Sequence, residues 1–156
     1  MRKTFLLAAL LSAFAVHAAD TPGSNPAMPQ TTVSDRLANA RKALAVQDYT
    51  TAMRELNVAV RDAPQNADVH NLMGYTYRKR SGPDLTKAFE HYYTALRIDP
   101  RHKGAHEYIG QAYLMEKRLP QAEVHLVELE KICGGTSCPE YQDLAKAIAE
   151  FKATAK

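Results

Sequence analysis

Apolar and small residues recur along the middle of the chain at the spacing of an α-helix. Ala52, Leu56, Ala59 and Val60 fall on one face of such a helix, and the same three- and four-residue spacings return twice further along. Breaks containing Pro or Gly separate these stretches, at positions 63–64, 81–83, 99–100 and 134–135. The pattern predicts short paired helices, and therefore an all-α fold.

The helical pattern is an internal repeat with a period of 34 to 36 residues. One hairpin cannot bury its own apolar face, so three stacked hairpins are needed to form a core. Gly74 with Tyr77 and Gly110 with Tyr113 repeat a small-x-x-aromatic pair. The matching positions of the three repeats are Ala52-Leu56-Ala59-Pro64, Ala88-Tyr92-Ala95-Pro100 and Ala122-Leu126-Leu129.

At these small and aromatic positions the chain resembles the tetratricopeptide repeat family, from about residue 34 to 134. The resemblance implies a right-handed α-solenoid of three helix-turn-helix repeats. The first repeat departs from the family pattern with Ala40 and Ala43, and the chain has no Trp. The second repeat carries two extra residues around 80–83. Small residues at Gly74 and Gly110 should let the two helices of a hairpin approach closely.

A last amphipathic segment, residues 139–152, should cap the array. Tyr141, Leu144, Ile148 and Phe151 form one apolar stripe, whereas the opposite side is charged. A repeat array needs such a terminal helix with a polar outer face. We therefore expect a repeat domain over residues 34–152, with seven helices.

The first residues have the pattern of a secretory signal peptide, residues 1–18. Arg2 and Lys3 precede a short apolar stretch, and Ala18 is the expected cleavage position, with Ala19 as the second choice. Residues 19–33 read as a flexible linker rich in Pro and Thr, without a periodic apolar pattern. We expect an exported bacterial protein, periplasmic or alternatively secreted, with no membrane anchor after cleavage. Loss of residues 1–18 lowers the formal charge from +3 to +1, which argues against nucleic acid as a partner.

Cys133 and Cys138 are the only cysteines and lie five residues apart, before the capping helix. In an oxidising compartment such a pair predicts a disulfide that fixes the start of that helix. A labile redox pair is the first alternative. The second is a metal site that uses these cysteines together with His102 and His106, although we expect no metal or cofactor.

The resemblance also implies a concave groove lined by the first helix of each repeat, in which a protein or peptide partner binds. We expect Tyr75 and Tyr108 to act as apolar anchors. Two roles are open for the basic residues Arg78 and Lys79: they supply cations for an acidic or C-terminal segment, or, together with Arg80, they only solvate the end of a helix, where positive charge also favours the helix dipole. The second helices, with Arg61 and Lys87, should line the convex side. The candidate groove residues are Arg41, Asn71, Tyr75, Arg78, Lys79, Tyr108 and Gln111, together with Leu37, Leu44, Glu107 and Met115.

No motif of a hydrolase, nucleotide-binding enzyme or metalloprotease occurs in the chain. We therefore expect a non-enzymatic scaffold that is monomeric on its own. Self-association through the groove is the remaining alternative.

Overall fold

The computed structural model describes residues 31–154, so the expected signal peptide and most of the linker lie outside the described residues. All regular elements in this range are α-helices, which confirms the predicted fold class. Seven helices follow one another along the chain: α1 (Val33–Ala45), α2 (Tyr49–Asp62), α3 (Ala67–Lys79), α4 (Leu85–Ile98), α5 (Lys103–Met115), α6 (Leu119–Cys133) and α7 (Pro139–Thr154).

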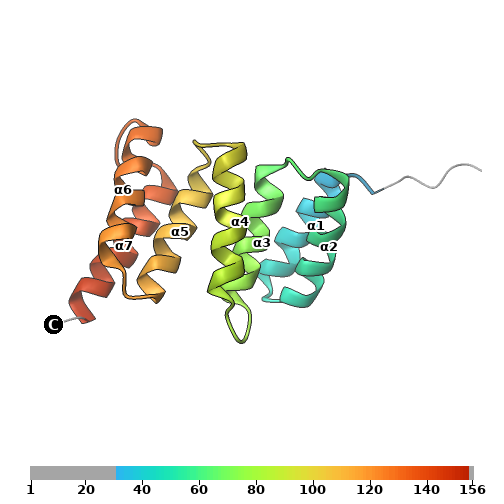
Figure 1. Ribbon diagram of the computed structural model, residues 1–156, viewed down its shortest axis with the longest axis horizontal. Helices are drawn as coiled ribbons and strands as arrows, with labels where there is room; N and C mark the ends of the chain where they lie inside the picture. Colours follow the sequence, from blue (N-terminus) through green and yellow to red (C-terminus); the bar gives the residue numbers. More distant parts are fainter. Residues whose placement is uncertain (1–30, 155–156) are drawn as a thin grey trace, which may run out of the picture. The chain divides into compact units, whose positions relative to one another are not determined.

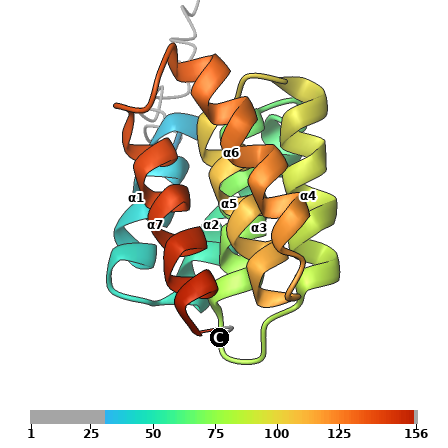
Figure 2. The same ribbon diagram turned by 90° about the vertical axis from the view of Figure 1, so that its left-hand side faces the viewer.

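The first six helices form three hairpins that stack side by side in chain order (Figure 1). Each hairpin is an antiparallel pair: α1 with α2, α3 with α4, and α5 with α6. Contacts between hairpins run mainly from the second helix of one hairpin to the first helix of the next, α2 with α3 and α4 with α5, and α3 also packs less closely on α1 and α5. The last helix, α7, packs on α5 and α6 and closes the array (Figure 2).

Side chains of the residues just before the helices fix where most of them begin. Thr32 and Asp35 form a reciprocal capping box at α1, and Asp48 accepts a hydrogen bond from the Thr51 amide at α2. Asp84 caps α4 in the same way, so Pro83 lies in the loop before this helix and not in its first turn. Pro120 does lie in the first turn of α6.

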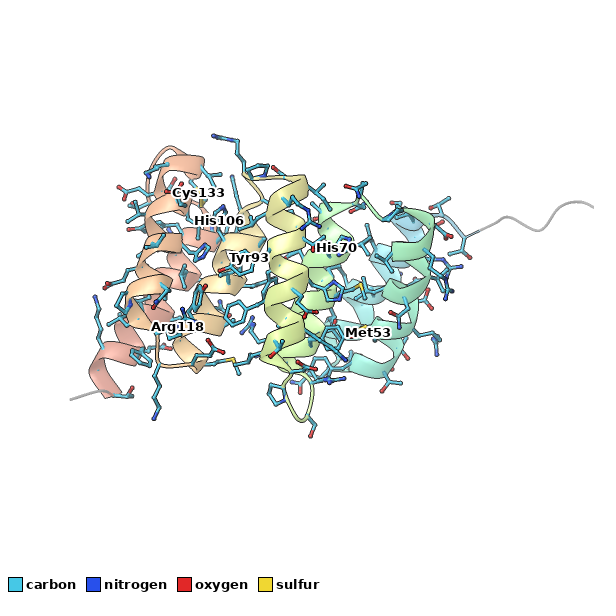
Figure 3. All side chains as sticks on the ribbon, viewed as in Figure 1. Met53, His70, Tyr93, His106, Arg118 and Cys133 are labelled. Carbon is cyan, nitrogen blue, oxygen red and sulfur yellow. A yellow bond between two sulfur atoms is a disulfide. The ribbon has the colours of Figure 1, made fainter. Side chains whose placement is uncertain are left out.

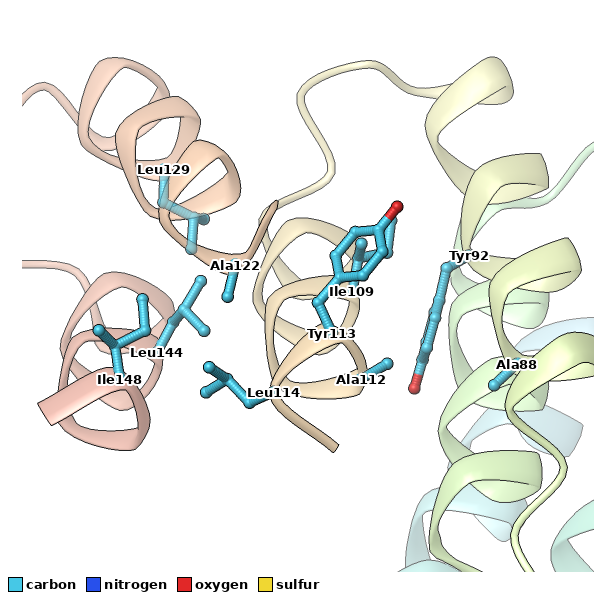
Figure 4. Close-up of a cluster of buried hydrophobic side chains, with 10 residues drawn as sticks. All are labelled: Ala88, Tyr92, Ile109, Ala112, Tyr113, Leu114, Ala122, Leu129, Leu144 and Ile148. Carbon is cyan, nitrogen blue, oxygen red and sulfur yellow. The ribbon is translucent and has the colours of Figure 1, made fainter. Parts of the chain in front are cut away.

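Buried side chains form two neighbouring clusters, one between α1, α2 and α3 and one between α4, α5, α6 and α7 (Figure 4). Tyr92 is the largest side chain that is fully buried. Its ring lies against the backbone of α3 at Gly74, where an added Cβ would be 2.6 Å from two ring carbons and 3.0 Å from the Ala88 carbonyl oxygen. Gly74 therefore permits the close approach of α3 and α4, as the sequence predicted.

Gly110, at the equivalent position of the third hairpin, has a different neighbour from the one expected. An added Cβ there would lie 2.5 Å from a methyl carbon of Leu144, which belongs to the capping helix. In place of the tyrosine that covers Gly74, α6 carries Leu126, which has a shorter side chain. The capping helix thus packs its Leu144 side chain against the glycine, so Gly110 serves the contact with α7.

The turn between α6 and α7 contains the two cysteines, which are joined in a disulfide. Cys133 is the last residue of α6, and Gly134 follows it in the left-handed region at φ 69°. Cys138 immediately precedes α7. A second tie between these helices is the ion pair of Lys152 with Glu123, at 2.6 Å.

None of the helices in residues 31–154 has the length and apolar character needed to cross a membrane.

The contact of Gly74 with Tyr92 gives a first testable prediction. Gly74→Ala places a methyl group where a rigid ring and a backbone carbonyl leave no room, so it should lower the free energy of unfolding by about 1–3 kcal/mol. The control is Gly110→Ala, since the Leu144 side chain can turn away at smaller cost. Urea unfolding measures both. Equal free energies of unfolding for the two variants would contradict the role given to Tyr92.

Candidate functional site

The first helices α1, α3 and α5 bring their inward residues to a cleft of about 290 Å³, which we call the inner cleft. Four of the predicted groove residues, Arg41, Leu44, Tyr75 and Tyr108, lie in its wall. They come from three different repeats, so the cleft exists only when the hairpins are stacked. Its full lining is Arg41, Leu44, Ala45, Leu72, Tyr75 and Tyr108.

Arg78 lies beneath the two tyrosines and not in solvent. The centroids of the Tyr75 and Tyr108 rings are 5.0 Å apart, and the Arg78 guanidinium carbon is 5.4 Å from each of them. Its Nε donates a hydrogen bond to the Tyr92 hydroxyl at 3.2 Å, and only 5% of the residue is exposed. The side chain therefore holds the tyrosines on the core, which corrects the expectation of an exposed cation for an acidic partner.

A polar network along the edge of the groove connects α1 with the starts of α3 and α5. Asp68 of α3 forms an ion pair with Arg41 of α1 and accepts a hydrogen bond from Nε2 of His102, each at 3.1 Å. The Nδ1 atom of His102 accepts from the Ala105 amide, so its proton is on Nε2. These partners hold the pKa of Asp68 below its usual value, with the His102 hydrogen bond as the main cause.

The C-terminal half of the groove carries carboxylates. Glu107 is 7% exposed and accepts a hydrogen bond from Gln111 at 2.8 Å. Burial raises the pKa of Glu107 to about 7, and the charges of Asp143 and Glu140 on α7 act in the same direction, whereas Arg78 opposes them. No basic side chain of residues 31–154 forms an ion pair with any of the three carboxylates.

The remaining predicted groove residues differ in how far they can reach a partner. Asn71 is buried between α3 and the Gly104 turn of α5, and its Oδ1 has no hydrogen-bond partner in the described residues. Lys79 is exposed at the end of α3. Gln111 lines a separate shallow depression, beside α7, with Leu114 and Phe151 among its neighbours.

The residues of the alternative metal or redox site do not come together. Cys133 and Cys138 are bonded to each other, and Glu140 is the nearest further ligand type. His102 faces Asp68, whereas Nδ1 of His106 faces His125 on α6. The four side chains therefore have separate partners and offer no shared coordination site.

Two histidine pairs at equivalent positions were not expected from the sequence. In the second hairpin His70 pairs with His91 through their Nδ1 atoms at 3.2 Å, and in the third His106 pairs with His125 at 3.0 Å (Figure 3). His70 and His106 also contact proline carbonyls through Nε2, at 2.9 and 3.1 Å, so each donates there and accepts at Nδ1. Burial lowers the pKa of His91, and that of His125 to about 4.

Comparison with known proteins supports the fold and leaves the family open. No family model matches the chain. A segment of 67 residues, 42% of the chain, is 40% identical to the E3 SUMO-protein ligase RanBP2 of Drosophila melanogaster, but it spans only 2% of that protein. Among solved structures, the chain is similar to the TPR2B domain of yeast Sti1, which was solved as a complex with pHsp70. The TM-score is 0.62 with 16% identity, over 76% of this chain and 96% of that one, so the chain has a tetratricopeptide-like fold.

The environment of Glu107 gives a second prediction. The pKa of Glu107 is about 7 in the folded chain, against an ordinary value of 4.5 for a solvated glutamate. Between these two pH values the folded chain therefore retains a proton that the unfolded chain has released. This contribution to stability is therefore present at low pH and lost as the pH rises from 4.5 through 7. Glutamine does not ionise, so Glu107→Gln should abolish this pH-dependent decrease in stability. Its effect on the free energy of unfolding should be more favourable at pH 8 than at pH 5, by about 1–2 kcal/mol.

Urea unfolding of both proteins at the two pH values checks this prediction. The histidine pairs have the opposite pH dependence, but they are common to both proteins and cancel in the difference. Glu128→Gln is the control, because that carboxylate pairs with Lys131 at the surface and its pKa is lowered. A Glu107→Gln effect that is the same at both pH values would mean that the carboxylate is well solvated.

Proposed function

We propose that the protein is a non-catalytic scaffold that holds an extended segment of a partner protein in its concave groove. The observation that carries the proposal is the inner cleft, in which half-buried tyrosines from two repeats lie beside the apolar side chains of Leu44 and Leu72. Aromatic side chains in such a position are frequent centres of binding energy, because the surrounding walls exclude water.

Pre-organisation strengthens this interpretation. Tyr75 and Tyr108 are held by Arg78, which is itself held by Tyr92, so the cleft walls are fixed before any partner arrives. A partner therefore does not have to order these side chains, and less conformational entropy is lost on binding.

The charges along the groove favour one orientation of the bound segment. Arg41 and Lys79 are exposed toward the N-terminal repeats, whereas Glu107, Glu140 and Asp143 lie at the other end. A segment with a Lys or Arg side chain near Glu107 would supply the cation that these carboxylates lack. Because Arg78 is buried, it is not available to pair with an acidic segment in the middle of the groove.

The structural neighbour is consistent with binding of a protein segment. The TPR2B domain of Sti1 was solved with a protein partner, and its fold extends over most of this chain. That likeness supports the mode of binding and says nothing about which partner this chain takes. The matching segment of RanBP2 is too small a part of that protein to bring over its ligase activity.

Site-specific photo-crosslinking in native cells tests the proposal. A photoreactive side chain at Ala45, an exposed residue of the inner cleft, should give a discrete crosslinked partner. The same group at Val124, which is 59% exposed on α6, is the control and should give none. Tyr75→Ala should weaken the affinity for the captured partner by about 2 kcal/mol.

The outcome at the two positions decides between the alternatives. Crosslinks from Val124 alone would place the partner on the outer face and refute the groove assignment. Crosslinks from Ala45 to a second copy of the chain would support self-association instead. Ala45→Trp, which fills the cleft without removing a packed side chain, should abolish capture while leaving the melting temperature unchanged.

We also propose that the protein is exported to the bacterial periplasm, or alternatively secreted. The support is the pattern of residues 1–18, with Arg2 and Lys3 before a short apolar stretch, together with the disulfide of Cys133 and Cys138. Disulfides are rare in reducing cytosol, so a disulfide that positions a capping helix fits an oxidising compartment.

Export gives a prediction that needs only the native protein. N-terminal sequencing of the periplasmic or secreted form should find Ala19 first, or Asp20 with the alternative cleavage. A thiol titration of the same material should find no free thiol, because both cysteines are paired. Full-length protein with two reactive thiols in the cytoplasm would refute the proposal.

A further inference from the structure

A second cleft lies outside the concave groove. It has a volume of about 740 Å³ and lies on the face of the second helices, between α2 and the end of α3. It exists because α2 packs on α1 and α3 only, and no contact within the described range joins α2 to α4. Met53, which lines this cleft, is labelled in Figure 3.

Three arginines line the cleft, and we call it the arginine cleft. Arg54 and Arg61 are seven residues apart on α2, so they share one helix face with Asn57 and Val58 between them. Arg80 enters from the end of α3. The only acidic residue in the lining is Asp48, whose carboxylate is already occupied with capping α2.

The positive charges of the cleft are weakly compensated. Arg61 forms no ion pair with any residue of the range 31–154. The Nε atom of Arg54 is 3.6 Å from Glu55, but that carboxylate has a closer partner in Arg36 at 3.1 Å. Arg80 is 3.8 Å from its nearest acid, Asp84, and its Nε has no hydrogen-bond partner.

The next repeat provides an internal comparison, because equivalent positions lie 36 residues on. Arg54 corresponds to Glu90, and Arg80 corresponds to Glu116. Asn57 corresponds to Tyr93, whose hydroxyl is hydrogen-bonded to that of Tyr113. The fold therefore does not require arginine at these positions. The first outer cleft is open and cationic, whereas its counterpart carries a bulky aromatic side chain and two acids.

From this arrangement we propose that the arginine cleft binds a small organic anion that carries a phosphate or more than one carboxylate group. Its volume is in the range of small-molecule sites, and guanidinium groups match the geometry of phosphate and carboxylate oxygens. Tyr49, Met53 and Val58 supply apolar contact for the body of the ligand. The site is separate from the concave groove, so it does not depend on the proposed scaffold function.

Titration of the full mature chain with phenyl phosphate, followed by NMR of backbone amides and arginine side chains, tests this proposal. We expect saturable shifts that are confined to residues of the arginine cleft. Phenol, which has the same ring without the charge, should cause none. Phthalate provides a dicarboxylate for comparison: tighter binding of phenyl phosphate would identify a phosphate ester as the ligand class, and tighter binding of phthalate a dicarboxylate.

Variants show whether the arginines carry the binding. Arg54→Glu with Arg80→Glu installs the residues found at the equivalent positions 90 and 116 and should weaken phenyl phosphate binding by about tenfold or more. Arg61→Gln, at an exposed position, tests the same site if the double variant does not fold. Arg97→Gln, at the equivalent position on α4, is the control and should bind as the wild type does.

Two results would overturn the proposal. One is the absence of saturable shifts with either anion up to about 10 mM, a concentration that reveals even weak sites. The other is an affinity in the Arg61→Gln variant equal to that of the Arg97→Gln control. Binding through these charges should also weaken as salt is added, because salt screens exposed charges.

Discussion

The structure depends on one close contact, between the backbone of α3 at Gly74 and the buried ring of Tyr92. The ring fills the space inside the second hairpin, and its hydroxyl accepts a hydrogen bond from Arg78. Arg78 in turn lies against the rings of Tyr75 and Tyr108. The inner cleft is therefore built outward from the core in a continuous series of contacts. A side chain on Gly74 would disturb both the hairpin and the groove.

The helical architecture could be predicted because it follows from spacing alone. Small and aromatic residues recur at 34 to 36 residues, and only stacked hairpins bury such a pattern. Details that depend on which residue lies next to a position in space could not be predicted from the spacing. Pro83 suits a first helical turn, but Asp84 is the better cap and displaces the start of α4. Gly110 repeats Gly74 in sequence, yet its space is filled by Leu144 from a helix outside the repeat.

The candidate site shows the same limit more clearly. Register places Arg41, Tyr75 and Tyr108 on the groove side, and the structure brings them into one cleft. The position of a residue within the repeat does not reveal how deeply its side chain is buried. It therefore gave no sign that Arg78 is enclosed by aromatic rings. The histidine pairs did leave a signal, because His91 and His125 are themselves repeat-equivalent, 34 residues apart. A search for recurring polar positions, and not only small and aromatic ones, would have found them.

Helix geometry explains how a short basic run serves two surfaces. Successive residues of an α-helix turn by about 100°, so side chains two positions apart point in nearly opposite directions. Arg78 accordingly lies under the tyrosines of the groove, whereas Arg80 lies in the arginine cleft on the outer face. Lys79 between them remains exposed. The basic run at the end of α3, which the sequence alone could place in solvent, is thus divided between the two faces of the array. Because Arg78 is fixed by the core and Arg80 is weakly paired, the two faces can change independently while the repeat fold is preserved.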